Sequence, residues 1–263
     1  TSLMLTLGCG CDSFLDETNY SDVTSEGGYY DTEAGLNAVV NACYTPLRFW
    51  AGKEDAIGLS ETGTDIIAAG SGCVDNNMAA YTQSLDGTNS ACTFYFDRFY
   101  AAINWCNTAI FHAQTVPNPS NDEILATTLN KREAEARVLR TFYYWILTET
   151  FGDTYYTDQP STSIVMNPVK TSTDNIYQYM FDDLDWAIKS KLSTLQNDGG
   201  RVTIWTAKAL KARLLLTRAS EKNDVDMYGQ AYDLAKDVIE NGPFELAEDF
   251  ASIWDMKNSD GNS

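Results

Sequence analysis

The chain has 263 residues, 44% of them hydrophobic, which is enough to bury a substantial core in one or two domains. Its 18 Lys and Arg residues stand against 37 Asp and Glu residues, so the formal net charge at pH 7 is −19. A field of that sign repels phosphate backbones and anionic lipid headgroups, which argues against nucleic acid as a partner. The charge excludes more functions than it selects, because an acidic surface is also common in proteins that are merely soluble.

The chain opens with a short apolar run that ends in small residues and two cysteines, Cys9 and Cys11. Such a run is typical of the end of a secretory signal peptide, and it is far too short to span a bilayer. Small residues before a cysteine also resemble the signal of a bacterial lipoprotein, in which the acylated cysteine becomes the mature N-terminus. We therefore expect residues 1–10 to be a signal-peptide remnant and Cys11, or alternatively Cys9, to carry the lipid. The competing interpretation is a buried N-terminal strand.

Apolar residues recur at helical spacing through most of the chain. Asp31-Thr32-Glu33 is expected to cap a first helix, which Pro46 should end or kink. The stretch from 51 to 93 is rich in Gly, Asp, Ser, Thr and Asn and lacks periodicity, so it predicts long loops. A second helix presents an apolar face over residues 96–110 and should end near Pro117.

The second half of the chain predicts four more helices. The third helix has the strongest pattern, follows a capping box at residues 120–123 and should stop at Gly152. The fourth begins near residues 172–174, the fifth begins at Thr203, and the sixth runs from about Asp226 to Asn241.

The sixth helix has the spacing of the second helix of a tetratricopeptide repeat, in which small alanines let paired helices pack closely and a proline ends the unit. The pattern comprises Tyr228, Ala231, Ala235, Val238 and Pro243. The first-helix signature is not present, so the repeat is degenerate. Convincing strands are missing from the pattern, except for a short hairpin expected near residues 155–169. The sequence therefore predicts a mainly α fold, a tetratricopeptide-like helical repeat scaffold with long loops.

The cysteines and the single histidine do not have the spacing of a metal site. The sequence has no Cys-x-x-Cys pair and only His112 as a histidine, so we expect neither a metal nor a cofactor. Cys43 and Cys106 lie on apolar helical faces and are expected in the core. Cys73 and Cys92 flank a polar stretch, where an oxidising exterior would permit a disulfide, and the sequence leaves this pairing open.

The sequence predicts no catalytic residues. A histidine-dependent mechanism could use only His112, whose place in a helix is at least as well explained by packing. A glycosidase needs only two carboxylates, but the number of acids does not indicate one when most acids are solvated. A charged segment at residues 132–140 is interpreted as ion pairs along one helix, formed among Arg132, Glu133, Glu135, Arg137 and Arg140.

The stretch from Trp50 to Phe96 is the candidate binding region, because a rigid helical scaffold commonly carries recognition on its loops. Its aromatic rings could stack on sugar faces, while its amides and carboxylate could bond hydroxyl groups. Each residue alone is at least as well explained by local turn bonding, so the prediction rests on the cluster. The candidates are Trp50, Asp65, Asn76, Asn77, Tyr81, Asn89 and Tyr95.

Several motifs, in order along the chain, resemble the N-terminal half of SusD/RagB proteins. They are Cys11-Asp12-Ser13-Phe14-Leu15-Asp16, the helix start Tyr30-Asp31-Thr32-Glu33-Ala34, the segment from Phe99 to Asn107, the segment from Glu133 to Tyr144 with its exit Phe151-Gly152-Asp153, and Arg201-Val202-Thr203. The first motif favours Cys11 over Cys9, and Asp65 resembles an acidic position near the ligand site of that family. Each motif alone is weak, but together they cover nearly the whole chain.

The resemblance implies a surface lipoprotein of a Gram-negative, Bacteroidota-like outer membrane, attached to the membrane through its lipid alone. Such a protein captures oligosaccharides and delivers them to a SusC-like TonB-dependent transporter, without enzymatic activity. The alternative is a tetratricopeptide-type scaffold that binds a protein partner or peptide rather than glycan. Members of the family are about twice as long. Residues 11–30 are therefore expected to be the tether, and residues 31–263 the N-terminal helical domain, truncated at its C-terminus.

Overall fold

The computed structural model describes residues 28–51, 54–70, 79–83, 85–118, 120–190, 192–194 and 200–254. Five residues of the sequence-based predictions lie outside these ranges, namely Cys9, Cys11, Cys73, Asn76 and Asn77. The described part of the chain is mostly helical, which confirms the predicted mainly α fold.

The elements follow one another in the predicted order. The first part contains α1 (Glu33–Tyr44), α2 (Leu47–Ala51) and α3 (Glu54–Ser60), the last of which lies in the stretch predicted as long loops. The long helices α5 (Ser90–Thr115) and α6 (Glu123–Phe151) come next, followed later by α7 (Thr173–Lys189), α8 (Ile204–Lys222) and α9 (Val225–Asn241). An antiparallel ladder pairs β1 (Thr154–Tyr155) with β2 (Lys170–Thr171), and the 3-10 helix η2 (Phe250–Trp254) comes last.

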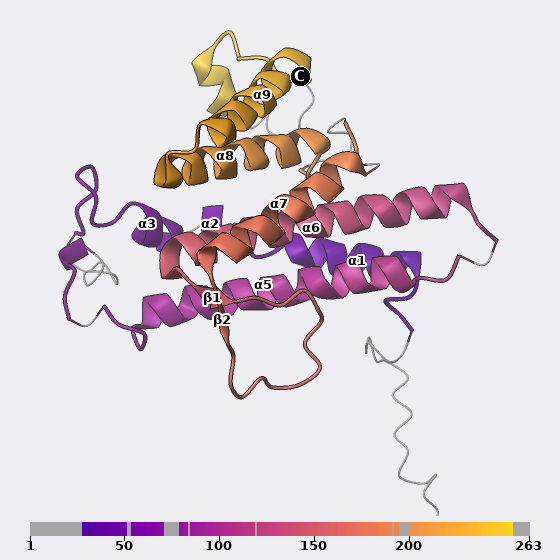
Figure 1. Ribbon diagram of the computed structural model, residues 1–263, viewed down its shortest axis with the longest axis horizontal. Helices are drawn as coiled ribbons and strands as arrows, with labels where there is room; N and C mark the ends of the chain where they lie inside the picture. The colour runs from indigo at the N-terminus through magenta and orange to yellow at the C-terminus, as the bar shows by residue number, and fades with distance from the viewer. Residues whose placement is uncertain are drawn as a thin grey trace, which may run out of the picture.

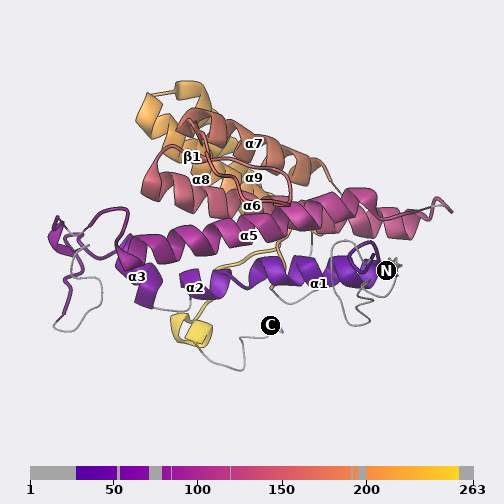
Figure 2. The ribbon, with the colours of Figure 1, turned by 90° about the horizontal axis from the view of Figure 1, so that it is seen from below.

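The helices α5 and α6 form an antiparallel pair through the middle of the molecule (Figure 1). Helix α1 packs against both of them on one side, and α7 packs on α6 from the other side (Figure 2). Helix α8 then packs on α7, and α9 packs on α8. Each helix from α6 onward therefore lies beside the one before it, and this serial stacking confirms the predicted tetratricopeptide-like scaffold.

The core lies where α1, α5, α6 and α7 meet. Large side chains such as Leu36, Tyr143 and Met180 are almost completely buried there. Cys43 and Cys106 are fully buried in the same cluster, which confirms that they are core residues. Burial of these apolar faces is the main favourable term that holds the helices together.

Side-chain caps fix where several helices begin and end. Thr32 accepts a hydrogen bond from the backbone N–H of Gly35 at 3.1 Å, and Ser172 and Thr203 cap α7 and α8 in the same way. Gly152 ends α6 with a φ of +70°, a conformation that glycine adopts without strain. These boundaries agree with the sequence-based predictions.

The start of α6 differs in detail from the predicted capping box. The cap is Asp122 rather than Ser120, because Asp122 Oδ1 accepts from the backbone N–H of Ile124 at 2.8 Å. Asn121 before it has a φ of +52°, in the left-handed region that asparagine tolerates. Asn118 bonds both backbone groups of Asp122, at 2.8 and 2.9 Å, and so holds this turn in place.

Charged side chains of α6 also fix α7 in position. Two ion pairs within α6 follow the predicted three- and four-residue spacing. Arg140 instead reaches across to Asp183 of α7, and Arg137 bonds the same carboxylate at 2.6 Å. The segment therefore belongs largely to a buried interhelical network rather than to a row of pairs along one helix.

Residues 156–169 form a loop that projects from the helices on the side of α5 (Figure 1). Its base is fixed by Asn107, whose side-chain amide donates to the carbonyls of Thr157 and Gln159, both at 3.1 Å. The Tyr144 hydroxyl donates to the same Thr157 carbonyl at 2.8 Å. The predicted hairpin is present as this loop closed by the short β1–β2 ladder.

Candidate binding site

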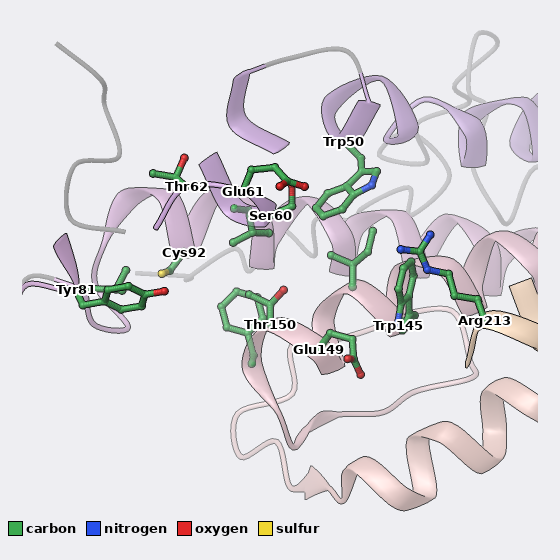
Figure 3. A pocket seen from close by; sticks show the side chains of 14 residues that line it. Trp50, Ser60, Glu61, Thr62, Tyr81, Cys92, Trp145, Glu149, Thr150 and Arg213 are labelled. Carbon is green, nitrogen blue, oxygen red and sulfur yellow. The ribbon is translucent and has the colours of Figure 1, made fainter. Parts of the chain in front are cut away.

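A cavity of about 820 Å³ opens where the predicted loop region meets α6 and α8 (Figure 3). Its volume lies within the range of about 300–1,000 Å³ that is usual for small-molecule sites. Its walls come from the end of α2, the end of α3 and the turn after it, Tyr81 and Leu85, the first turn of α5, the C-terminal turns of α6, and one residue of α8. The aromatic rings are those of Trp50, Tyr81, Trp145 and Phe151, and the polar side chains are those of Ser60, Glu61, Thr62, Glu149, Thr150 and Arg213.

Trp50 reaches the cavity because of the break at Pro46. Proline cannot donate a backbone hydrogen bond, so α1 ends before it and the short α2 begins in a new direction. The Trp50 ring then meets the rings of Phe99 and Phe142 edge to face, with centroids 6.0 and 6.5 Å apart. These contacts hold one part of the ring in the core while another part lines the cavity.

Helix α6 supplies Trp145 and Glu149, which lie one turn apart on one face. The guanidinium carbon of Arg213 on α8 lies 4.9 Å from the centre of the Trp145 ring, which is a cation–π contact. Glu149 Oε1 accepts a hydrogen bond of 2.5 Å from the Tyr177 hydroxyl. Burial and the Glu149 carboxylate raise the pKa of Tyr177 well above its ordinary value, so this hydroxyl remains a donor at neutral pH.

Tyr81 lies at the other end of the cavity from Arg213 (Figure 3). Its backbone φ is +47°, a left-handed conformation that is uncommon for a bulky residue. Its side chain is 72% exposed. Strained backbone conformations cluster at binding sites, where they place a side chain for contact with a ligand.

The cavity brings together two of the predicted binding residues, Trp50 and Tyr81. Asp65 is exposed and Asn89 is half-buried just before α5, but neither lines the cavity. Cys92 does line it, while Cys73 lies outside the described residues. The disulfide between Cys92 and Cys73 therefore stays a prediction.

Tyr95 is placed differently from the prediction. Its side chain is only 2% exposed, and its ring stacks on Phe99 in the core with centroids 6.3 Å apart. The reason is that α5 begins at Ser90, so Tyr95 lies on the buried face of a helix rather than in a loop. The prediction is corrected accordingly: the ring of Tyr95 has no face exposed for stacking on a sugar.

Most cavity residues were not predicted from the sequence as binding residues, among them Trp145, Glu149 and Arg213. Trp145 and Glu149 are four residues apart, next to the apolar face of α6, and this spacing was the one local signal for them. Arg213 lies within α8 and gave no local signal, because only the packing of the helices brings it to Trp145.

Two smaller cavities adjoin the large one. One, of about 410 Å³, shares Cys92 and Phe151 with it and reaches β1 and β2. The other, of about 400 Å³, shares Trp145 and Arg213 and lies between α6 and α8. Each smaller cavity thus lies next to the candidate site and shares two of its lining residues.

The described ranges contain neither a metal-binding cluster nor a helix that could span a membrane. No group of three or more His, Cys, Asp or Glu side chains is arranged there to hold a metal ion. In the same part of the chain, no helix combines the length and the apolar character needed to cross a bilayer. His112 is buried, with Nδ1 2.7 Å from Asp31 Oδ1, which places it in the core rather than in a site.

Residues 64–260 match the model of the SusD-like family, which is described as "Starch-binding associating with outer membrane". A SusD-like protein of Bacteroides ovatus is 26% identical over 274 residues, an alignment that covers 98% of this chain and 46% of the relative. The chain thus spans about half the length of the curated relatives it matches.

Solved structures of SusD superfamily proteins have a similar fold. One from Parabacteroides distasonis has a TM-score of 0.73 and 21% identity, covering 91% of this chain and 50% of that one. A protein described as a laminarin binding SusD-like protein has a TM-score of 0.70 and 20% identity, covering 86% of this chain and 48% of that one. At these identities the likeness shows that the fold is shared.

Proposed function

Because this chain belongs to the SusD-like family, we propose that it is a glycan-binding protein of the bacterial surface. We also propose that the 820 Å³ cavity takes part in binding. Its ligand would be an oligosaccharide segment, for which the two adjoining cavities offer further space.

The observation that carries the proposal is the combination of ring faces and hydrogen-bonding groups around one open cavity. Trp50 and Tyr81 offer aromatic surface, while Glu61, Glu149 and Arg213 offer acceptors and donors. A sugar presents an apolar face together with hydroxyl groups that both donate and accept, so it suits such a lining. The laminarin binding described for a protein of the same fold supports a saccharide ligand.

We propose binding without catalysis at this site. A glycosidase would need one of two carboxyl groups to donate a proton to the leaving oxygen. In the structure, Glu149 Oε1 accepts a hydrogen bond from Tyr177, and the second oxygen remains to bind a ligand hydroxyl. The family description, which names starch binding, also supports a binding function.

We also propose that the protein delivers glycan to a TonB-dependent transporter, which it contacts through the loop between β1 and β2, residues 156–169. Residues 159–169 carry no charged side chain, although the whole chain has a net charge of −19. Bonds from Asn107 and Tyr144 fix the base of the loop, from which its tip projects. Exposed apolar surface without charge favours contact with a protein. The exposed side chains are Ile164, Val165, Met166 and Val169, at 85%, 51%, 80% and 78%.

The proposal includes a lipid anchor at Cys11, with Cys9 as the alternative, followed by a tether to residue 30 and the helical domain from residue 31. Both cysteines lie outside the described residues. Support comes from the cysteine motif and from a family description that names the outer membrane. The intact mass of membrane-extracted protein tests this point, because an unmodified chain would contradict it.

Glycan binding itself is tested with the full-length protein on a glycan array, followed by calorimetric titration with laminarin oligosaccharides and with the saccharides that the array identifies. Saturable binding of at least one saccharide is the expected result. If no glycan binds while the protein still associates with a transporter, the proposal fails, and the alternative of a protein-binding scaffold is favoured.

A further inference from the structure

The large cavity is lined by more acidic than basic side chains. Glu61, from the turn after α3, and Glu149, from α6, lie on different sides of it (Figure 3). Arg213 is the one basic residue among the described residues that line it. One negative charge is therefore left over, and the net charge of −19 on the whole chain adds to the negative potential at its entrance.

The guanidinium of Arg213 is positioned by a ring rather than by a carboxylate. It lies over Trp145 at 4.9 Å, and none of the ion pairs in the described ranges includes it. Glu149 is positioned by Tyr177, whose hydroxyl donates a hydrogen bond to one of the two carboxylate oxygens. The cavity thus presents a carboxylate acceptor on each of two sides and a guanidinium donor on a third.

We infer that this cavity selects uncharged stretches of glycan and discriminates against sugars that carry carboxylate or sulfate groups. The inference rests on the proposed glycan-binding function. A hydroxyl group can donate to Glu61 or Glu149 and can accept from Arg213. An anionic substituent can only accept, and both carboxylates repel it. At a separation of about 7 Å in water, each such repulsion lowers affinity up to roughly threefold at low ionic strength.

Comparing a neutral saccharide with acidic derivatives of the same saccharide separates the effect of charge on affinity from the effect of sugar shape. The glycan array, which contains neutral and acidic glycans, identifies the saccharide that binds most tightly to the full-length protein. That saccharide is then compared with derivatives made from it by sulfation and by oxidation of its C6 hydroxymethyl groups to carboxylates. We expect a neutral glycan to bind most tightly and each acidic derivative to bind about threefold more weakly, because Arg213 offsets one of the two repulsions. The gap should narrow as salt increases, because salt screens the repulsion.

A charge-removing variant identifies the cause. Glu61→Gln combined with Glu149→Gln keeps an oxygen acceptor at both positions and should raise the affinity for the acidic derivatives several-fold relative to that for the neutral saccharide. The matched control, Glu123→Gln combined with Glu240→Gln, removes the same charge from exposed residues outside the cavity and should leave the ratio almost unchanged.

Three outcomes would overturn the inference. An acidic glycan that binds more tightly than any neutral one overturns it while leaving the proposed function intact, and Arg213 would then be the anion-binding residue. An equal change of the ratio in the double variant and its control rejects the two carboxylates as the cause. Binding of no glycan at all overturns the proposed function, and this inference with it.

Discussion

Arg140 on α6 binds Asp183 on α7 through two parallel hydrogen bonds, from Nε to Oδ2 and from Nη2 to Oδ1, each 2.8 Å long. Both side chains are almost completely buried. The remaining guanidinium nitrogen donates to Asn107 on α5 at 2.8 Å, and Asn107 holds the base of the β1–β2 loop. One carboxylate thus joins three helices and the projecting loop, through charge-assisted bonds that are stronger than neutral ones.

Replacing this carboxylate should be costly. Asp183→Ala leaves Arg140 and Arg137 without their shared counter-charge in the interior, so we expect the free energy of unfolding to fall by about 3–5 kcal/mol. Urea denaturation measures this quantity. The neighbouring exposed Asp182, which accepts a hydrogen bond from Gln178, provides the control, and Asp182→Ala should cost less than about 0.5 kcal/mol. Equal small losses in the two variants would contradict the structural role assigned to Asp183.

Two helical glycines should respond to alanine with opposite signs. A Cβ at Gly35 in α1 would lie 1.9 Å from the Tyr29 carbonyl oxygen, so Gly35→Ala should lower the free energy of unfolding by about 1–3 kcal/mol. A Cβ at Gly229 in α9 meets nothing within 4 Å. Gly229→Ala should therefore raise stability by about 0.5–1 kcal/mol, because alanine loses less entropy in a helix. Thermal unfolding of both variants checks the prediction, and a gain for Gly35→Ala would refute it.

Buried tyrosines should make the protein sensitive to alkali. Burial raises the pKa of Tyr44, Tyr143, Tyr144 and Tyr177 well above the ordinary value of about 10. Above that pH the unfolded chain loses these protons while the folded chain keeps them. Stability is thus unaffected below about pH 10 and falls above it, by up to about 1.4 kcal/mol per pH unit for each tyrosine.

The midpoint of urea unfolding, followed from about pH 8 to about pH 11, measures this effect. Tyr177→Phe removes one of the four groups and should make the alkaline decline shallower, even though it also removes the bond to Glu149. A midpoint that does not change with pH over this range would show that the tyrosines ionise equally in both states.

A charge at the apolar tip of the β1–β2 loop should weaken binding to the transporter and leave the affinity for saccharide unchanged. Met166→Asp places a charge on a side chain that is 80% exposed, so we expect co-purification with the transporter to fall at least tenfold while glycan affinity is retained. Ile239→Asp, on α9 and 78% exposed, is the matched control. If both variants retain the transporter equally, the loop is not the contact surface.

Local signals predicted the scaffold well. Thr32, Ser172 and Thr203 cap helices at the expected places because a cap depends on residues three or four positions apart. The cap of α6 is Asp122 rather than the predicted Ser120, because Asn118 holds a turn that the capping-box pattern does not include. The buried pair of Arg140 with Asp183 could not be predicted, since it depends on how α7 packs against α6.

The candidate site was predictable only in part, for the same reason. Trp50 and Tyr81 line the cavity as members of the stretch from Trp50 to Phe96, where aromatic rings are interspersed with polar residues and glycines. Tyr95 was assigned wrongly because the apolar pattern of α5 becomes clear only after its first turn. Arg213 reaches the cavity through the packing of α8, which the sequence alone does not reveal.

The central claim is that the cavity beside Tyr81 binds glycan, and calorimetric titration of Tyr81→Ala tests it most directly. The Tyr81 ring is largely exposed, so its removal should leave the melting temperature unchanged and weaken saccharide binding by about threefold to tenfold through the loss of stacking. Tyr232→Ala removes a ring that is 65% exposed on α9, outside the cavity, and should bind as the unmodified protein does. Equal affinity of the protein and both variants for the same saccharide would contradict the account.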